Sequence, residues 1–299
     1  MELAVAAAPV PAGTSYLPNA EFLLYFPTKT KTMPIPLEDN FSDILRKAQR
    51  GLGLSDRGLA SRAGISEEEL ESVKKERYNA ESLRKLAPIL GLGPQALTAL
   101  PDYQPASVTL PRLVTFSTAY GGMRVNAYLA WDAPGGLAAV FDTGADCTAI
   151  LEALRAKNLT LCGIFITHTH GDHIQALDLL RSETGAPVFV SSREPLLGAD
   201  LFEPGRRFEC GKLRIEARLT WGHSRGGTTY VVHGLEHPVA VVGDALFAGS
   251  MGGGLVSYAD ALRTNRQEIL TLPPETVLCP GHGPLTTVGE ERIHNPFFA

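Results

Sequence analysis

The chain has 299 residues, of which 44% are hydrophobic and 20% are charged, and its formal net charge is −5. Such a length and composition are typical of one large globular domain, or of a medium domain with a small one. The acidic balance argues against the broad basic field that binds nucleic acid non-specifically.

The N-terminus and the cysteines favour a cytoplasmic protein. No apolar run is long enough to cross a bilayer, so no membrane partner is predicted. The start, Met1-Glu2, lacks a basic region, and prolines interrupt the alanine-rich stretch after it, which is a poor match to a signal peptide. Two cysteines lie in apolar, strand-like runs, which favours reduced, buried thiols. The four cysteines, none in a Cys-x-x-Cys pair, are Cys147, Cys162, Cys210 and Cys279.

Residues 1–39 are predicted to be an N-terminal arm that is mobile in part. Its first twenty residues are rich in Ala, Pro and small polar residues, as in mobile chain ends. Residues 21–26 are apolar enough for a strand or a packing arm, and prolines follow them.

Residues 40–100 are predicted to form a small all-α domain. Ser55 is a candidate N-cap of its second helix, and Ser66 of its third, where Glu69 would complete a capping box. A fourth helix is predicted over residues 81–90, ending at a glycine. The first helix is indicated by apolar residues at helical spacing, namely Phe41, Ile44, Leu45 and Ala48.

The stretch GLSDRGLASRAGISEEELESVKK, followed by LRKLAPILGL, resembles the phage-repressor type helix-turn-helix family. In that resemblance the helix that would enter the major groove begins at Glu67, Glu68 and Glu69, where carboxylates would face phosphate repulsion. Residues 41–100 hold ten Lys/Arg and eight Asp/Glu, a net charge of +2. We therefore favour a docking or dimerisation role, which would allow a homodimer, over DNA binding, and keep both open.

Residues 101–111, with three prolines, are predicted to link this domain to an α/β domain over residues 112–299. A β-hairpin is predicted over residues 113–131, around a Gly-Gly turn. The next strand ends at Asp142, and strands and helices then alternate.

The stretch T-H-T-H-G-D-H, residues 167–173, places three imidazoles and a carboxylate within six positions. A short apolar strand is predicted before it, over residues 161–166, and a helical pattern follows it. Such groups repel and desolvate one another unless a cation holds them, and a helix does not bring residues two apart together. The sequence therefore predicts a metal-binding loop between a strand and a helix, with ligands His168, His170, Asp172 and His173.

Three later strand-like runs each end in a glycine followed by a metal-capable residue: His223, Asp244 and His282. Glycine relieves crowding where the backbone bends toward a shared centre. With the first cluster, the candidates comprise five histidines and two aspartates. This set of nitrogen and oxygen donors suits two divalent ions of the Zn, Fe or Mn kind.

The order Asp142, H-x-H-x-D-H, His223, Asp244, His282 resembles the metallo-β-lactamase superfamily over about residues 110–299. The resemblance implies an α/β (α+β) fold, an αββα sandwich preceded here by the small helical domain. It implies that Asp142 supports the metal loops from behind the ligands. It also implies two ion sites, one held by His168, His170 and His223, the other by Asp172, His173 and His282, with Asp244 bridging them.

The stretches GDALFAGS (residues 243–250) and PGHGPLTTVGEERIHNPFF (residues 280–298) resemble the glyoxalase II-like branch of that superfamily. Three features depart from it. Three glycines, residues 252–254, stand where an arginine-containing segment is common, and Gln175-Ala176 replaces the frequent Gly-Gly. The chain also ends at Ala299, without the helical domain that binds glutathione in that branch.

The resemblance implies a metal-dependent hydrolase that uses a hydroxide held between two metals, zinc before iron or manganese, to cleave a small-molecule acyl thioester or ester, as hydroxyacylglutathione hydrolases do. Asp172 would be the catalytic residue that orients the nucleophile and shuttles its proton. One alternative is a persulfide dioxygenase with a single iron on His168, His223 and Asp244. The other is a metabolite-sensing regulator whose helical domain binds DNA.

Overall fold

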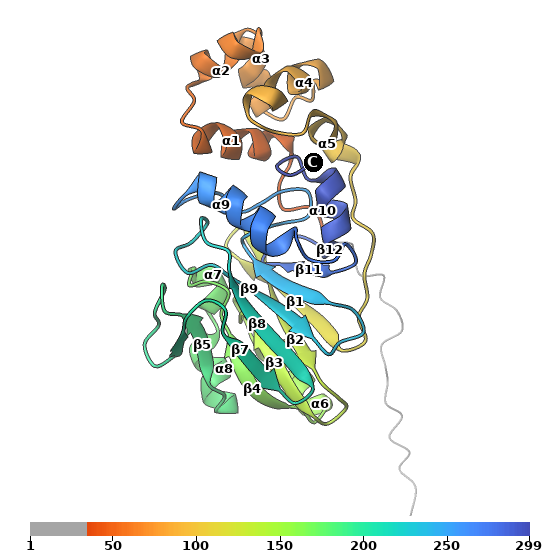
Figure 1. Ribbon diagram of the computed structural model, residues 1–299, viewed down its shortest axis with the longest axis vertical. Coiled ribbons are helices and arrows are strands. Elements are labelled where there is room, and N and C mark those ends of the chain that lie inside the picture. Colours follow the sequence, from red (N-terminus) through yellow and green to blue (C-terminus); the bar gives the residue numbers. More distant parts are fainter. Residues whose placement is uncertain (1–34) are drawn as a thin grey trace, which may run out of the picture. The chain divides into compact units, whose positions relative to one another are not determined.

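The computed structural model describes residues 35–299, and these form one compact unit by their internal contacts. The strand or arm predicted over residues 21–26 lies outside the described residues. Within residues 35–299, none of the helices has the length and apolar character needed to cross a membrane. Two six-stranded sheets, packed face to face, form the centre of the chain beyond residue 112 (Figure 1).

The first sheet has the strand order β1-β2-β3-β4-β5-β6. Its first three strands are antiparallel, beginning with the predicted hairpin, and β3 to β6 are parallel. The strands are β1 (Leu113–Tyr120), β2 (Met123–Trp131), β3 (Leu137–Phe141), β4 (Thr160–Phe165), β5 (Val188–Ser191) and β6 (Asp200–Phe202).

The second sheet has the strand order β12-β11-β10-β9-β8-β7. Only β10 and β11 are parallel neighbours in it, so both point their C-terminal ends toward the same edge. The strands are β7 (Arg207–Cys210), β8 (Leu213–Leu219), β9 (Thr228–His233), β10 (Val239–Gly243), β11 (Val277–Pro280) and β12 (Thr286–Thr287).

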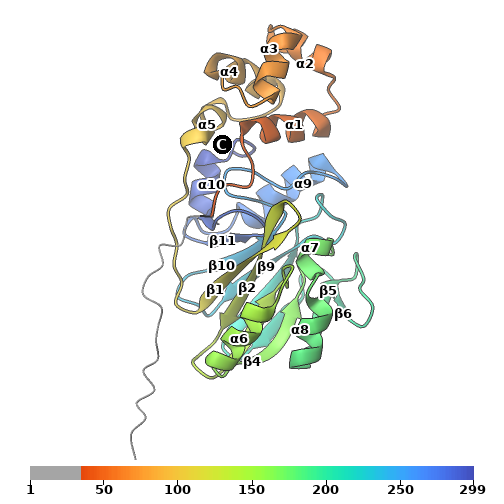
Figure 2. The same cartoon turned by 180° about the vertical axis from the view of Figure 1, so that it is seen from behind.

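Helices cover the outer faces of both sheets. The helices α6 (Thr148–Ala156) and α8 (Leu177–Thr184) lie on the first sheet (Figure 2), where Ile150 and Leu180 belong to one buried cluster with residues of β2 to β5. The segments η2 (Asn265–Ile269) and α10 (Val288–His294) contribute to a second cluster, on the outer face of the second sheet. A third cluster fills the space between the sheets. The predicted αββα fold is confirmed.

Residues 41–102 form five α-helices and a 3₁₀ turn. The predicted apolar face of the first helix is buried. Ser66 accepts a hydrogen bond from Glu69 N, but the Glu69 carboxylate accepts one from Ser82 Oγ, so the predicted capping box is wrong in its second half. The elements are α1 (Phe41–Gly51), α2 (Asp56–Ala63), α3 (Glu67–Lys74), α4 (Ala80–Ile89), α5 (Pro94–Ala99) and η1 (Leu100–Asp102).

The buried core of these helices continues into residues near the C-terminus. It includes Tyr258 and Ala261 of α9 (Tyr258–Thr264), and Phe297. The contact of α1 with α9 is close, since a Cβ added at Gly51 would lie 2.2 Å from Cγ of Tyr258. The helices therefore pack on the α/β part without an intervening solvent layer.

The prediction of reduced thiols is wrong for Cys162. This residue of β4 forms a disulfide with Cys210 of β7, which ties one sheet to the other. The two cysteines are 48 residues apart and carry no local signal, and only the stacking of the sheets brings them together. Cys279 is a free, buried thiol, as expected, and so is Cys147.

Candidate metal centre

The seven predicted ligands lie in segments that follow four strands, at one edge of the paired sheets. His168 and His170 follow β4, while His223, Asp244 and His282 follow β8, β10 and β11 respectively. The loop prediction is partly wrong, because Asp172 and His173 lie in the short helix α7 (Gly171–Ile174). The helix turns these two side chains inward from one side, while the preceding loop places the other two histidines.

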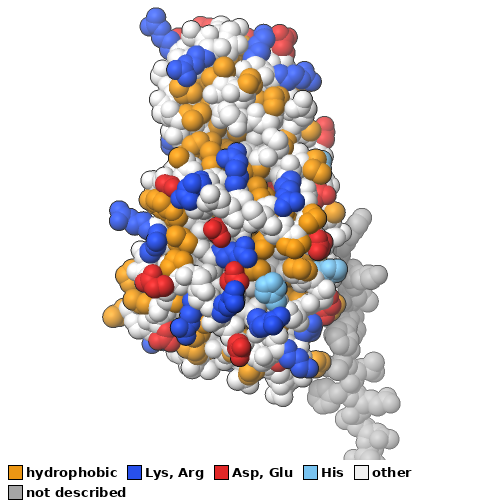
Figure 3. Space-filling view, viewed as in Figure 1, with side chains coloured by type: hydrophobic (Ala, Val, Ile, Leu, Met, Phe, Trp, Pro, Cys, Tyr) orange, Lys and Arg blue, Asp and Glu red, His pale blue; other side chains and the backbone are white. Residues whose placement is uncertain are grey.

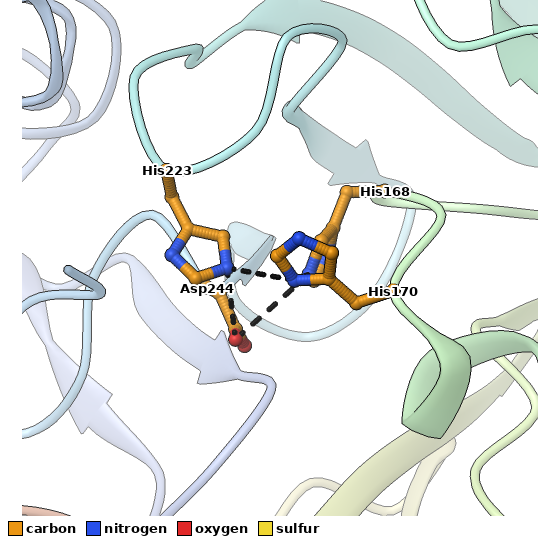
Figure 4. Close-up of side chains that lie close together, drawn as sticks. All are labelled: His168, His170, His223 and Asp244. Carbon is orange, nitrogen blue, oxygen red and sulfur yellow. Dashed lines mark hydrogen bonds and ion pairs between the residues drawn. The ribbon is translucent and has the colours of Figure 1, made fainter. Parts of the chain in front are cut away.

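The first group comprises His168, His170, His223 and Asp244 (Figure 4), whose ligand atoms all lie within 4.8 Å of one another. His170 Nδ1 is 3.0 Å from His168 Nε2 and 3.0 Å from His223 Nε2. The Asp244 carboxylate faces them, with Oδ2 at 3.4 Å from His223 Nε2. Three imidazole nitrogens and one carboxylate thus converge on one point.

The second group comprises Asp172, His173 and His282, which meet the same 4.8 Å limit. His282 Nε2 is 3.3 Å from Asp172 Oδ2 and 3.4 Å from Asp244 Oδ2. The other oxygen of Asp244, Oδ1, is 3.3 Å from His173 Nε2. The Asp244 carboxylate therefore lies between the two groups.

Hydrogen bonds at Nδ1, on the side away from the other ligands, fix the orientation of the His223 and His282 rings. Nδ1 of His223 is 3.0 Å from Gly253 O, and Nδ1 of His282 is 2.6 Å from Arg124 O. A carbonyl oxygen can only accept, so in each ring Nδ1 carries a proton. In the neutral ring, Nε2 then presents its lone pair to the centre, as a metal ligand must.

Asp142 lies directly behind the loop, as the resemblance implied. Its Oδ1 accepts a hydrogen bond from Thr167 N, and its Oδ2 accepts one from Thr167 Oγ1, both at 2.7 Å. Oδ2 also lies 2.7 Å from His173 Nδ1. Thr167 Oγ1 is in turn 3.1 Å from His168 Nδ1, so one carboxylate orients a ring in each group.

The glycines before three of the candidates leave room that a side chain would fill. A Cβ at Gly281 would lie 2.2 Å from Asp244 Oδ1 and 2.6 Å from His173 Cε1. Gly222 and Gly243 have φ values of 129° and 52°, which few L-residues adopt. The predicted role of these glycines is confirmed.

Burial and charge act in opposite directions on the rings. Burial lowers the pKa of His168, and the neighbouring His173 adds to the effect. For His173 itself burial is outweighed by the charge of Asp244, which raises the pKa to about 10. His282 likewise overcomes burial through its contacts with Asp172 and Asp244, which raise its pKa to about 11. Without a cation, the carboxylates thus hold protons on two of the rings.

The residues fit bound cations. His173 Nε2 and Asp244 Oδ1 are buried and lie 3.3 Å apart, yet they form no hydrogen bond with each other or with another residue of 35–299, which is costly for polar atoms. Around them converge imidazole nitrogens and carboxylate oxygens, the donors that Zn, Fe and Mn accept. The site has the ligand number and the arrangement for two divalent ions on either side of Asp244.

Neighbours of the centre include residues that the sequence pattern did not single out. The Phe247 ring meets the His282 ring edge-on at 5.6 Å, and Lys47 Nζ lies 5.1 Å from the Phe247 centroid. Glu38 packs beside Gly283, where an added Cβ would lie 3.2 Å from Glu38 N. Lys47 and Glu38 precede the first ligand, His168, by 121 and 130 positions (168 − 47 and 168 − 38), so the local spacing of residues could not reveal them.

Comparison with known proteins relates the same part of the chain to one family. The family described as the metallo-beta-lactamase superfamily matches residues 120–282. The chain is 32% identical over 184 residues to probable metallo-hydrolase YqgX of Bacillus subtilis, covering 53% of this chain and 85% of that protein. It is 28% identical over 199 residues to hydroxyacylglutathione hydrolase GloC of Haemophilus influenzae, covering 58% and 92%.

Solved structures resemble the same region. The crystal structure of BLEG-1 B3 metallo-beta-lactamase matches with a TM-score of 0.56 and 30% identity, covering 62% of this chain and 100% of that one. ETHE1 from Myxococcus xanthus matches with a TM-score of 0.54 and 26% identity, covering 61% and 83%.

Proposed function

The chain belongs to the metallo-beta-lactamase superfamily, and we propose that within it the protein hydrolyses a thioester or a related ester. One observation carries the proposal: two groups of ligand atoms, each within 4.8 Å, adjoin a single buried carboxylate. A relative named for hydroxyacylglutathione hydrolysis, at 28% identity, supports the thioester. The stretches that contain Asp244 and His282, residues 243–250 and 280–298, resemble the glyoxalase II-like branch and also support the thioester.

In this proposal His168, His170 and His223 would hold one divalent ion and Asp172, His173 and His282 would hold the other, and Asp244, which adjoins both groups, would serve both. When bound, such ions supply Lewis-acid chemistry, polarising an acyl oxygen and lowering the pKa of water to about 7. Zinc suits the set best, and the donors also accept iron or manganese.

The protein side chains supply orientation and proton handling. Asp172 leaves 12% of its side chain exposed, whereas the His173 side chain is fully buried. Asp172 therefore reaches solvent, and we assign it the role of accepting the proton of an attacking water. Asp142 and Thr167 keep the rings of His168 and His173 in the tautomer that binds a cation.

The test is thioester turnover in the wild type and in Asp172→Asn. We expect the variant to lose at least about 100-fold in kcat, because it removes both an ionic ligand and the proton acceptor. His233→Ala, at an exposed site on β9, is the matched control and should keep full activity. A fully active Asp172→Asn would refute the assignment.

A mononuclear-iron dioxygenase is the second candidate. Two observations support this candidate. The chain resembles ETHE1 in structure, and the three residues that would hold a single iron, His168, His223 and Asp244, converge in the first group. A single iron in the first group would leave the second group, Asp172, His173 and His282, without a function. One iron per chain, with oxygen uptake on a persulfide and no thioester turnover, would favour this candidate.

For residues 40–100 we propose a docking role on the α/β part rather than DNA binding. The first turn of α3 contains Glu67, Glu68 and Glu69, which would repel phosphates. On the face in Figure 3, basic and acidic side chains are interspersed and form no continuous basic stripe. A salt-dependent shift of a DNA fragment would contradict the proposal.

A further inference from the structure

Helix α1 is anchored beside the loop that follows Asp244. Lys47 Nζ donates a hydrogen bond to Met251 O at 2.9 Å and pairs with the Asp39 carboxylate. Asp39 also accepts a hydrogen bond from Ser250 Oγ. At the end of the helix, Gly51 lies directly against the Tyr258 ring. The helix therefore has a fixed position relative to residues 250–258.

Arg50, one turn beyond Lys47, reaches the middle of this loop. Three glycines at positions 252–254 leave space there, and the Arg50 guanidinium is 3.4 Å from the point that a Cβ of Gly253 would occupy. Gly253 O is in turn 3.0 Å from His223 Nδ1. Adding bond lengths, the guanidinium lies within about 11 Å of His223 Nδ1, the ring nitrogen that faces away from the other ligands.

The Arg50 charge is not neutralised within the described residues. Lys47 pairs with Asp39, whereas the guanidinium of Arg50 makes no ion pair or hydrogen bond with a residue of 35–299. Arg50 is exposed to solvent, and α1 fixes its backbone. A guanidinium in such a place is able to bind a carboxylate in a two-pronged contact.

We propose that Arg50 is a specificity-determining residue that binds a carboxylate on the substrate, so that the helical region supplies part of the substrate site. The inference rests on the proposed function and names the substrate class: a thioester or ester that carries a carboxylate at a distance from the scissile bond. The acyl carbon lies at the centre, and the distal carboxylate meets Arg50.

The test compares a charged and an uncharged substrate. S-Lactoylglutathione carries carboxylates, whereas the lactoyl thioester of N-acetylcysteamine carries none. Arg50→Ala should raise KM for the charged thioester roughly tenfold, the effect of one lost charge-assisted contact at an exposed site, and leave kcat unchanged. For the uncharged thioester both constants should stay as in the wild type.

Two further variants separate recognition from a merely structural role. Arg57→Ala, which removes an exposed arginine from α2, should leave both substrates unaffected. The double variant Arg50→Ala/Gly253→Arg returns a guanidinium to the same space from the loop side. It should recover most of the KM for the charged thioester, because Gly253 has a negative φ and no other atom closer than 3.6 Å to its Cβ position.

Binding of S-methylglutathione, a thioether that hydrolysis does not cleave, gives a readout independent of turnover. Isothermal titration should show weaker binding to Arg50→Ala than to the wild type. Equal KM and Kd in the two proteins would overturn the role of Arg50 and leave the hydrolase intact. If the wild type cleaves neither thioester, the proposed function fails, and the titration still decides whether Arg50 binds the carboxylate.

Discussion

At the scale of the residue, the metal centre depends on positions that carry no side chain as much as on its ligands. Gly281 is the closest case, because it lies against both Asp244 and His173. These residues belong to different ligand groups, and Asp244 adjoins both. Any side chain at position 281 must therefore displace the carboxylate that lies between the two groups.

We expect Gly281→Ala to lose bound metal and activity while the protein stays folded. The new methyl group would lie 2.2 Å from Asp244 Oδ1, well inside contact distance, so the carboxylate must rotate away. Gly122→Ala, in the hairpin turn, is the control, since its Cβ meets nothing within 4 Å. Metal content and circular dichroism of both variants check this, and a Gly281→Ala protein with normal metal content would contradict it.

At the scale of the element, local patterns predicted the strands well and their lateral contacts poorly. The hairpin of β1 and β2 alternates apolar and polar residues around Gly-Gly, which determines its register. The four ligand loops could be found because each follows a strand-like run, and three of them place a glycine directly before the candidate ligand. The Cys162–Cys210 bridge and the contact of Arg50 with Gly253 join segments that are far apart in the sequence. Local sequence patterns therefore could not predict either contact.

The disulfide should stabilise the sandwich, because it closes a long loop between the two sheets. Its partners are 48 residues apart, for which chain entropy gives about 4 kcal/mol of stabilisation. The double variant Cys162→Ala/Cys210→Ala should unfold at a lower urea concentration than the oxidised wild type. Adding reductant should lower the wild-type midpoint alone. A midpoint that reductant does not change in either protein would show that the bridge contributes nothing.

At the scale of the whole molecule, one buried carboxylate joins the segment before β1, the loop after Asp244 and the C-terminal helix. Glu291 accepts hydrogen bonds from Thr286 Oγ1, Gly249 N and Asn295 Nδ2 at 2.7–3.0 Å. The Tyr103 hydroxyl lies 3.4 Å away. Burial raises the pKa of Glu291 to about 7 from an ordinary value of 4.5.

This shift makes stability depend on pH. Between pH 4.5 and about 7 the unfolded chain loses the Glu291 proton while the folded protein keeps it, so folding is progressively disfavoured as the pH rises. The loss reaches about 3 kcal/mol and is constant above pH 7. Glu291→Gln should abolish this part of the pH dependence. Glu275→Gln, at an exposed site, should retain it.

Urea midpoints at pH 5 and pH 8 measure the effect. The wild type should lose more stability between these two values than Glu291→Gln does, because only the wild type carries the titrating carboxyl. The same difference in both proteins would contradict the raised pKa. The amide can still donate to Thr286 and accept from Gly249, so the variant should fold.

The central claim is that two ions lie on either side of Asp244, and metal content tests it most directly. Elemental analysis of the full chain, purified without chelators, should give two divalent ions per chain, mainly zinc. The count should fall in Asp244→Ala, which removes the carboxylate shared by both groups. One iron per chain, with no hydrolysis of thioesters, would contradict the dinuclear hydrolase.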